Sequence, residues 1–278
     1  MNRREFARTV GATLPAWVVA RSPLAVRRLT RIGLELYSVR GAMRRDPEGT
    51  LAGIRAIGYT DVELLWSFGN FGRTPAQVKA SLQATGLAAP SAHIAPQILT
   101  KDWAKSLDDA KLLGHQYLIA AGLPAEARAS LDVWRQWADR FNAAGAEARA
   151  AGVWLAFHNE PDHMKPIDGQ VPYDLFISRL DPALVRLQLD VGNMVMGNGD
   201  PMAYLRRHRD RYWSFHLKDV VPDRSRDTGL GTGIVDLKAL LAAVPDIEHK
   251  PCFVEQEGKS EDLAAARADW AWLSRLEF

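Results

Sequence analysis

The sequence predicts an α/β fold, a single-domain (β/α)8 TIM barrel over residues 31–278, because short apolar runs alternate regularly with longer helical segments. Eight such runs follow residue 30, and their starts lie 27 to 39 residues apart. Strands that alternate with helices pair in parallel, and eight units of this length close into a barrel. The competing doubly wound sheet usually has a Gly-x-Gly-x-x-Gly turn after its first strand, whereas this chain has SVRGAMRRD there.

The expected strands are apolar runs that end in polar residues. They are IGLELYS (32–38), TDVELLW (60–66), LAAPSAH (87–93), QYLIAAG (116–122), GVWLAFH (152–158), VRLQLDV (185–191), YWSFHLK (212–218) and PCFVEQE (251–257). The segments between them have helical apolar spacing, acidic or Ser/Thr starts and glycine ends, as over 46–58, 74–86 and 130–152. No linker marks a second domain.

Residues 1–30 are predicted to be an export signal of the twin-arginine type. The pair Arg3-Arg4 precedes Phe6 and a modest apolar stretch over 9–20. That stretch is too short for a stable membrane span. We therefore expect the twin-arginine export machinery as a partner and a periplasmic or otherwise exported location. The alternative is a basic amphipathic helix at the start of a cytoplasmic protein.

The charge of the chain argues against nucleic acid as a partner. The formal net charge is +2, but residues 1–30 hold six arginines and one glutamate, so the remainder carries −3. A barrel of that charge does not suggest the basic surface that nucleic acids require. The single cysteine, Cys252, excludes an intrachain disulfide.

Ionisable residues gather where the expected strands end. The strand ends hold Glu35, Glu63, His93, His158, Glu160, Asp190, His216, Lys218 and Glu255. The carboxyl ends of the strands meet at one end of a TIM barrel, and residues of one parity point inward. Carboxylates packed together in a partly dry site repel one another unless a cation lies between them. Mixed imidazole and carboxylate ligands suit Mn²⁺, Fe²⁺, Co²⁺, Zn²⁺ or Mg²⁺, so we expect one divalent metal ion.

The motifs IGLELYSVR, GYTDVEL, SAH, FHNE, LQLDVGN, FHLKDV, LGTGIVD and FVEQEG occur in this order. Together they resemble the sugar phosphate isomerase/epimerase family, the xylose-isomerase-like TIM barrels, over nearly all of 32–258. The resemblance implies one divalent metal held by residues at the ends of strands five to eight. Asp190, His216 and Glu255 stand at three matching positions. At the fourth, the epimerases have a glutamate and this chain has His158, so the ligand is His158 or, two residues further on, Glu160; we favour His158.

The resemblance implies a small carbohydrate substrate and chemistry through an enediolate. We expect an isomerase or epimerase of a sugar or keto-sugar; the alternatives are a lyase or dehydratase acting by β-elimination and a non-catalytic sugar-binding barrel. A hydrolase of the apurinic-endonuclease type would need more histidine ligands than these strand ends supply.

Individual roles follow from this chemistry. Glu160 and Glu255 are the candidate acid/base residues, and Lys218 either stabilises the enolate oxygen or forms a salt bridge. Glu63 and His93 either hold substrate hydroxyls or support the metal ligands. Trp66, with Phe68 and Phe71, is expected to stack on a sugar ring. The glycine-containing loop 228–236 is expected to cover the site. The substrate and the oligomeric state are left open.

Overall fold

Eight parallel strands close into a ring in the computed structural model, which describes residues 26–259 and 261–278. Their order around the ring is β1-β10-β7-β6-β5-β4-β3-β2. The strands are β1 (Gly33–Glu35), β2 (Asp61–Leu65), β3 (Ala88–Ile94), β4 (Tyr117–Ala121), β5 (Trp154–His158), β6 (Val185–Asp190), β7 (Tyr212–Leu217) and β10 (Cys252–Val254). Each overlaps one of the expected apolar runs, so the predicted TIM barrel is confirmed.

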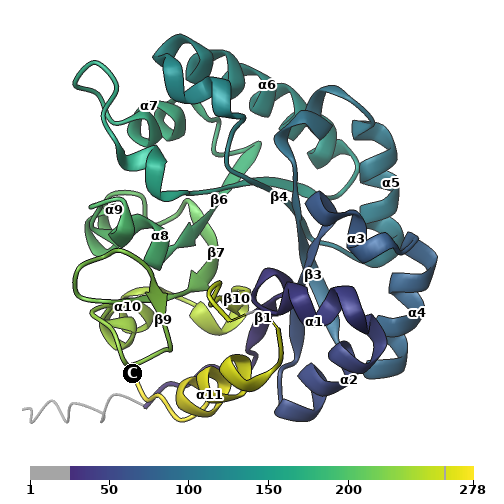
Figure 1. The fold of residues 1–278 in the computed structure, drawn as a ribbon. Coiled ribbons are helices and arrows are strands. Elements are labelled where there is room, and N and C mark those ends of the chain that lie inside the picture. Colours follow the sequence, from purple (N-terminus) through teal and green to yellow (C-terminus); the bar gives the residue numbers. More distant parts are fainter. Residues whose placement is uncertain (1–25, 260) are drawn as a thin grey trace, which may run out of the picture.

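Helices surround the ring of strands on its outer side (Figure 1). They are α1 (Arg40–Arg45), α2 (Pro47–Ile57), α3 (Gly69–Gly72), α4 (Pro75–Thr85), α5 (Trp103–Leu113), α6 (Leu131–Ala150), α7 (Pro172–Arg179), α8 (Val191–Met196), α9 (Pro201–Arg207), α10 (Leu237–Ala243) and α11 (Ala264–Leu273). Short 3-10 turns follow the first five strands: η1 (Leu36–Val39), η2 (Trp66–Phe68), η3 (Pro96–Thr100), η4 (Ala125–Ala129) and η5 (Pro161–Met164). A sixth, η6 (Ile247–His249), lies between α10 and β10. The first and last strands pair, and Arg27 and Phe278 exchange backbone hydrogen bonds of 3.0 Å, so the chain closes on itself.

Local signals in the sequence set the helix boundaries. Asp46 caps α2 by accepting a hydrogen bond of 2.9 Å from the Gly49 amide, and Pro47 occupies the first turn, where a missing amide hydrogen costs nothing. Thr74 and Gln77 form a reciprocal capping box at the start of α4. Gly86 ends that helix with a φ of 68°, a left-handed conformation that favours glycine.

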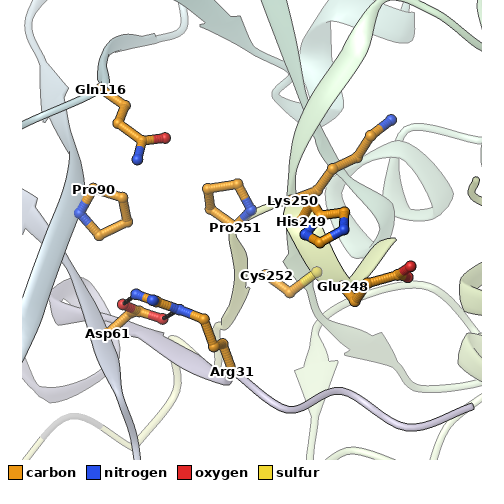
Figure 2. A pocket seen from close by; sticks show the side chains of 9 residues that line it. All are labelled: Arg31, Asp61, Pro90, Gln116, Glu248, His249, Lys250, Pro251 and Cys252. Carbon is orange, nitrogen blue, oxygen red and sulfur yellow. Dashed lines mark hydrogen bonds and ion pairs between the residues drawn. The ribbon is translucent and has the colours of Figure 1, made fainter. Parts of the chain in front are cut away.

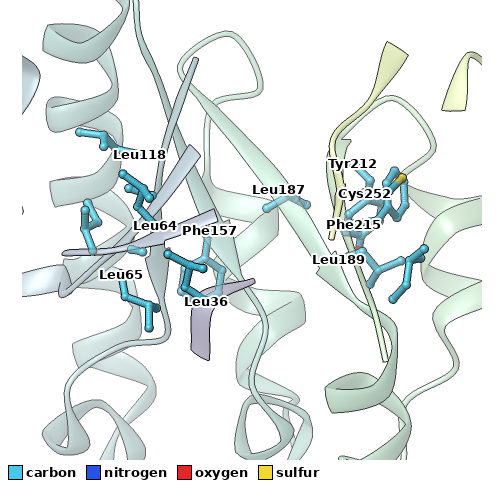
Figure 3. Close-up of a cluster of buried hydrophobic side chains, with 14 of the residues drawn as sticks. Leu36, Leu64, Leu65, Leu118, Phe157, Leu187, Leu189, Tyr212, Phe215 and Cys252 are labelled. Carbon is cyan, nitrogen blue, oxygen red and sulfur yellow. The ribbon is translucent and has the colours of Figure 1, made fainter. Parts of the chain in front are cut away.

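The core lies mainly between the strands and the helices, and the inside of the barrel is polar. Figure 3 shows buried apolar side chains along the strands, among them Leu64, Leu118, Phe157 and Leu187. Residues of the other parity point inward. There, Gln188 donates hydrogen bonds of 3.0 Å to Glu63 Oε1 and to Ser214 Oγ. The polar interior continues toward the carboxyl ends of the strands, where it meets the candidate site.

The loop after β7 contains a short antiparallel hairpin of β8 (Asp219–Val220) and β9 (Asp227–Thr228), which the sequence pattern did not predict. The glycine-containing loop that follows is held by Asp219. Its carboxylate accepts hydrogen bonds from the amides of Gly231, Gly233 and Val235 at 2.8–3.0 Å. The loop is therefore fixed beside the end of β7, and its expected role as a cover remains a prediction.

The predicted export signal lies largely outside the described residues, because the structure describes only Val26 to Thr30 of it. Among the helices of 26–259 and 261–278, none has both the length and the apolar character needed to cross a membrane.

Candidate metal centre

The carboxyl ends of the strands open into a cavity of about 280 Å³. Carboxylates and imidazoles are frequent in its lining, which consists of Glu35, Tyr37, Leu65, Ser67, Phe68, His93, Ala121, His158, Glu160, Asn193, Glu255 and Glu257. Three further predicted site residues, Asp190, His216 and Lys218, are completely buried and contact this lining. Most of the residues predicted from the strand ends are thus brought together.

Asp190, His216 and Glu255 come from neighbouring strands and place their donor atoms together. Asp190 of β6 and His216 of β7 are register partners, and Glu255 follows β10, which pairs with β7. Asp190 Oδ2 lies 4.0 Å from His216 Nδ1, which lies 2.6 Å from Glu255 Oε2. One donor atom from each residue lies within 4.8 Å of the other two. A mixed nitrogen and oxygen set at this spacing could hold a divalent metal ion.

The Asp190 carboxylate is fixed by its neighbours so that one oxygen faces this cluster. The Asn159 side chain bonds the backbone amide and carbonyl of Asp190, at 3.0 and 2.9 Å. Oδ1 accepts a hydrogen bond of 2.7 Å from the Asn193 amide at the start of α8. Oδ2 is completely buried and has the Lys218 ammonium 3.0 Å away as its charged partner. A buried carboxylate needs a cation beside it, and this oxygen also faces the donor atoms of His216 and Glu255 with which it could hold a metal ion.

The Glu63 carboxylate contacts the His216 ring on the nitrogen that faces away from Asp190 and Glu255. Glu63 Oε2 lies 2.5 Å from His216 Nε2, so the other ring nitrogen faces Asp190 and Glu255. A carboxylate on the second nitrogen is the usual partner of a metal-binding histidine. Burial disfavours the imidazolium form, but the Glu63 and Glu255 carboxylates outweigh it and hold the pKa of His216 well above its ordinary value. Of the two roles predicted for Glu63, the structure places it in position for ligand support.

His93 lies between this support and the cavity. Its ring stacks on His216 with centroids 5.0 Å apart, and its Nε2 lies 3.0 Å from Glu63 Oε2. Burial lowers the pKa of His93, but the Glu63 carboxylate outweighs burial and raises it to about 9. Because His93 also lines the cavity, contact with a substrate hydroxyl remains a prediction for it.

His158 presents a neutral imidazole to the metal cluster. Its Nδ1 donates a hydrogen bond of 2.8 Å to Gln188 Oε1, which leaves the lone pair on Nε2. That nitrogen lies 3.8 Å from Asp190 Oδ2 and 3.8 Å from Glu160 Oε1. Burial, followed by the charges of His216 and His93, holds the pKa of His158 well below its ordinary value. A neutral imidazole with a fixed tautomer is suited to bind a metal.

Glu160 lies further toward the cavity than His158. Its Oε2 accepts a hydrogen bond of 3.1 Å from Asn193 Nδ2, and its side chain is 36% exposed. Burial raises the pKa of the Glu160 carboxyl to about 8 against the opposing charge of Lys218. Its position fits a group that contacts substrate better than one enclosed among ligands.

Lys218 forms ion pairs with three carboxylates at once. Its Nζ lies 3.0 Å from Asp190 Oδ2, 3.1 Å from Glu255 Oε2 and 2.6 Å from Glu257 Oε1. Burial disfavours the charged amine, but these carboxylates outweigh it and hold the pKa of Lys218 well above its ordinary value. Gly192 makes room for this arrangement, because a Cβ there would lie 2.5 Å from Lys218 Cγ. The predicted salt bridge is present, and a role at an enolate oxygen stays a prediction.

The aromatic residues after β2 are arranged differently from the prediction. Trp66 faces His115, with ring centroids 5.5 Å apart, and its neighbours Ser67 and Phe68 line the cavity instead. The strand ends at Leu65, and the chain turns into η2 from Trp66 onward. Stacking of Phe68 on a substrate ring stays a prediction.

Sequence reasoning gave no role to several residues of the site. Asn193 and Glu257 bind the Lys218 ammonium, and Gln188 binds His93 and His158. The inward parity of Gln188 was visible in the sequence, but Asn193 and Glu257 lie outside the strands and the hydrogen-bond partners of all three depend on side-chain packing.

The profile of a known family matches most of the chain. It is described as the xylose isomerase-like TIM barrel, and the match covers residues 51–276. A curated relative, inosose dehydratase of Salmonella agona, is 31% identical over an alignment 127 residues long, which covers 39% of this chain and 41% of the relative. The aligned region therefore spans about two-fifths of that relative's length.

Solved structures share the fold at low sequence identity. A sugar phosphate isomerase/epimerase from Parabacteroides distasonis superposes with a TM-score of 0.77 at 24% identity, covering 88% of this chain and 98% of that one. The IOLI protein, solved with a bound zinc atom, superposes with a TM-score of 0.66 at 16% identity, covering 86% of this chain and 94% of that one.

Proposed function

The chain belongs to the xylose isomerase-like TIM barrel family, and from this premise we propose that it is a metal-dependent isomerase or epimerase of a sugar or keto-sugar. The observation that supports this most is the buried cluster of Asp190, His216 and Glu255 at the wall of a cavity that Glu160 also lines. A metal-binding group and a carboxyl group in the same cavity are the two parts that proton transfer next to a carbonyl requires.

The residues that would hold the ion are His158, Asp190, His216 and Glu255. When bound, a divalent metal acts as a Lewis acid on the carbonyl and hydroxyl oxygens of a ketose. The zinc atom in the similar IOLI structure supports a metal in this fold; for this chain, Mn²⁺, Fe²⁺, Co²⁺, Zn²⁺ and Mg²⁺ are the candidates.

Glu160 is the proposed base. It removes the proton from the carbon beside the carbonyl, and the electrons of that C–H bond form the enediolate. Lys218, a buried cation 3.0 Å from Asp190 and 2.6 Å from Glu257, offsets part of the negative charge of these carboxylates, and its proposed further role is to stabilise the enolate oxygen. Glu255 keeps a pKa well below its ordinary value, because Lys218 and His216 outweigh the effect of burial. It therefore remains a carboxylate and serves as a ligand more readily than as an acid.

A second candidate is a lyase or dehydratase that acts by β-elimination. The same enediolate can expel a hydroxyl group from the next carbon, and the inosose dehydratase relative supports this branch. We also propose an exported, periplasmic location, on the basis of Arg3-Arg4 and the apolar stretch that follows.

Elemental analysis of the purified protein tests the metal site. We expect about one divalent ion per chain, lost in Asp190→Ala and in His216→Ala. Asp61→Asn removes a carboxylate at the opposite end of the barrel and serves as the matched control, which should keep its metal. Full metal content in both Asp190→Ala and His216→Ala would refute the ligand assignment.

Incubation with an inosose or a ketohexose in heavy water separates the two reactions. Deuterium in the recovered sugar without an unsaturated product supports isomerisation or epimerisation, whereas loss of water supports the dehydratase. A protein that binds metal but produces neither result with a range of ketoses would contradict both.

A further inference from the structure

Glu35 is a carboxyl group in the cavity that the proposed function leaves without a role. It is the last residue of β1, it is completely buried, and it lines the same cavity as Glu160 and Glu255. Its Oε2 accepts a hydrogen bond from the Tyr37 amide. Among the described residues, its buried Oε1 has no hydrogen-bond partner; the nearest charged partner recorded for it is His93 Nδ1, 3.9 Å away.

The topology places Glu35 opposite Glu160. In the ring order, β1 and β5 are separated by four steps in either direction, so these two strands lie on opposite sides of the barrel. Glu35 ends β1, and Glu160 lies two residues after the end of β5. Because both line one cavity, a sugar ring bound there would have a carboxyl group on each side.

Two other carboxylates of the cavity wall are held by cations. Glu255 pairs with His216 and Lys218, at 2.6 and 3.1 Å, and Glu257 pairs with Lys218 at 2.6 Å. Glu35 has no such lysine or arginine partner among the residues that the structure describes. Burial, followed by the Glu255 charge, raises the pKa of its carboxyl to about 8, which agrees with a group that can carry a proton at neutral pH.

We propose that Glu35 is a second catalytic carboxyl group, which exchanges a proton with the substrate on the side of the cavity opposite Glu160. This inference rests on the proposed function, because it needs the enediolate that Glu160 generates. It adds a residue to that reaction and implies that the two proton transfers occur on opposite faces of the substrate.

Glu160 takes the proton from carbon, the C–H bond breaks, and its electron pair enters the enediolate. Glu35 in its acid form then gives its proton to the opposite face of the same carbon, a new C–H bond forms, and the configuration is inverted. In the dehydratase branch, Glu35 gives its proton to the leaving hydroxyl, the C–O bond breaks, and water departs. The two carboxyl groups then return to their starting forms by proton exchange with solvent.

The variant Glu35→Gln tests this inference, because glutamine can still accept the Tyr37 hydrogen bond but cannot supply a proton. The probes are an inosose and a ketohexose in heavy water, and deuterium exchange into the substrate is measured beside product formation. We expect product formation to fall on the order of 100-fold, while the exchange catalysed by Glu160 changes by less than about threefold. Glu160→Gln should lose both deuterium exchange and product formation. Glu35→Asp should recover part of the product formation.

Metal content and thermal unfolding serve as controls, and both should be unchanged in Glu35→Gln. Equal losses of exchange and product in this variant, or an unchanged rate of product formation, would overturn the role of Glu35 and leave the proposed function intact. Absence of both exchange and product in the unaltered protein would overturn the proposed function and this inference with it.

Discussion

Charged residues have different surroundings at the two ends of the barrel. At the carboxyl ends of the strands, here called the mouth, charged groups such as Lys218 and Asp190 are completely buried and in contact with one another. At the amino ends, here called the floor, Arg31 and Asp61 form an ion pair beside a cavity of about 230 Å³ (Figure 2). The Arg31 side chain is 60% exposed there, so its charge keeps most of its hydration.

A second floor cation is covered by aromatic rings. The Arg186 guanidinium lies 3.5 Å from the centroid of the Trp154 ring and 3.6 Å from that of Trp213. It also donates a hydrogen bond of 2.8 Å to the Tyr117 hydroxyl. Here the direct contacts of the cation are aromatic faces and a neutral hydroxyl, although Arg149 also lies over the Trp154 ring, 3.6 Å from its centroid.

This difference in the surroundings of the charged groups indicates a different role for each end of the barrel. Charges buried together cost desolvation energy that their attraction often only balances, so they are poor devices for stability. The mouth nevertheless concentrates them and leaves the buried Glu35 Oε1 without a hydrogen-bond partner among the described residues. In TIM barrels the carboxyl end of the strands holds the active site and the amino end contributes to stability. Four predictions test this division, in order of expected size.

The largest effect is expected for Lys218→Met in protein stripped of metal. This change leaves Asp190, Glu255 and Glu257 without their shared cation, and removal of one partner from a buried pair typically costs about 3–5 kcal/mol. Urea unfolding in the presence of a chelator measures the loss. Addition of Mn²⁺ or Zn²⁺ should restore part of it, because a metal ion can replace the ammonium charge.

The matched control is Lys250→Met at the floor. The Lys250 amine donates a hydrogen bond to the Tyr212 carbonyl and lies 5.4 Å from the Trp213 ring centroid. Its removal should cost about 1 kcal/mol. An equal loss in both variants would remove the distinction between the two ends.

The sequence predicted the strands of the barrel and their inward-facing residues more completely than the contacts between side chains. Each barrel strand and its following helix have their own local pattern, and the alternation within β6 and β7 was enough to bring Asp190 and His216 together. The side chain of Trp66 could not be placed from the sequence, because it follows the end of β2, and its ring faces His115 instead of the cavity. The ion pairs of Lys218 could not be predicted, because they depend on the space left by Gly192 and on residues far apart in the chain.

The second prediction concerns the pH dependence that His115 gives to stability; its pKa is shifted in the opposite direction from that of His93. Glu63 raises the pKa of His93 at the mouth, whereas burial lowers the pKa of His115, in the loop leading into β4, from 6.5 to about 4. Nδ1 of His115 donates a hydrogen bond of 2.6 Å to the Ala89 carbonyl. The neutral form is therefore favoured in the folded state, and the unfolded chain takes up a proton first as the pH falls.

His115 should thus contribute stability that is complete above pH 6.5 and is lost as the pH falls toward about 4. Between about pH 7 and pH 5 the loss should be on the order of 2 kcal/mol. Urea unfolding of the unaltered protein and of His115→Asn at both pH values measures it as the difference in pH dependence. Parallel behaviour of the two proteins would contradict the prediction.

Third, Arg186→Leu should lower the free energy of unfolding by about 1–2 kcal/mol, because the cation between Trp154 and Trp213 and its bond to Tyr117 are lost. Chemical denaturation measures the change, and the metal content should be unaffected. Arg186→Lys keeps the charge without the planar group that stacks on the rings, so it should recover only part of the loss. A loss of metal in Arg186→Leu would show that the floor and the mouth are coupled.

The smallest effect is expected for Arg31→Gln, the floor variant that most closely resembles Lys218→Met in chemical terms. Both remove a cation from a carboxylate, but Arg31 is largely hydrated and Asp61 keeps a hydrogen bond of 2.9 Å from the Thr60 hydroxyl. Although Asp61 is buried, the hydration of Arg31 should limit the contribution of this ion pair to about 1 kcal/mol, and salt should screen it. The difference between Arg31→Gln and the unaltered protein should therefore vanish in about 1 M salt, whereas the effect of Lys218→Met should persist, since salt does not reach a fully buried pair. If the stability losses of both variants vanished in salt, burial would not explain why the ion pairs of the mouth and the floor differ in strength.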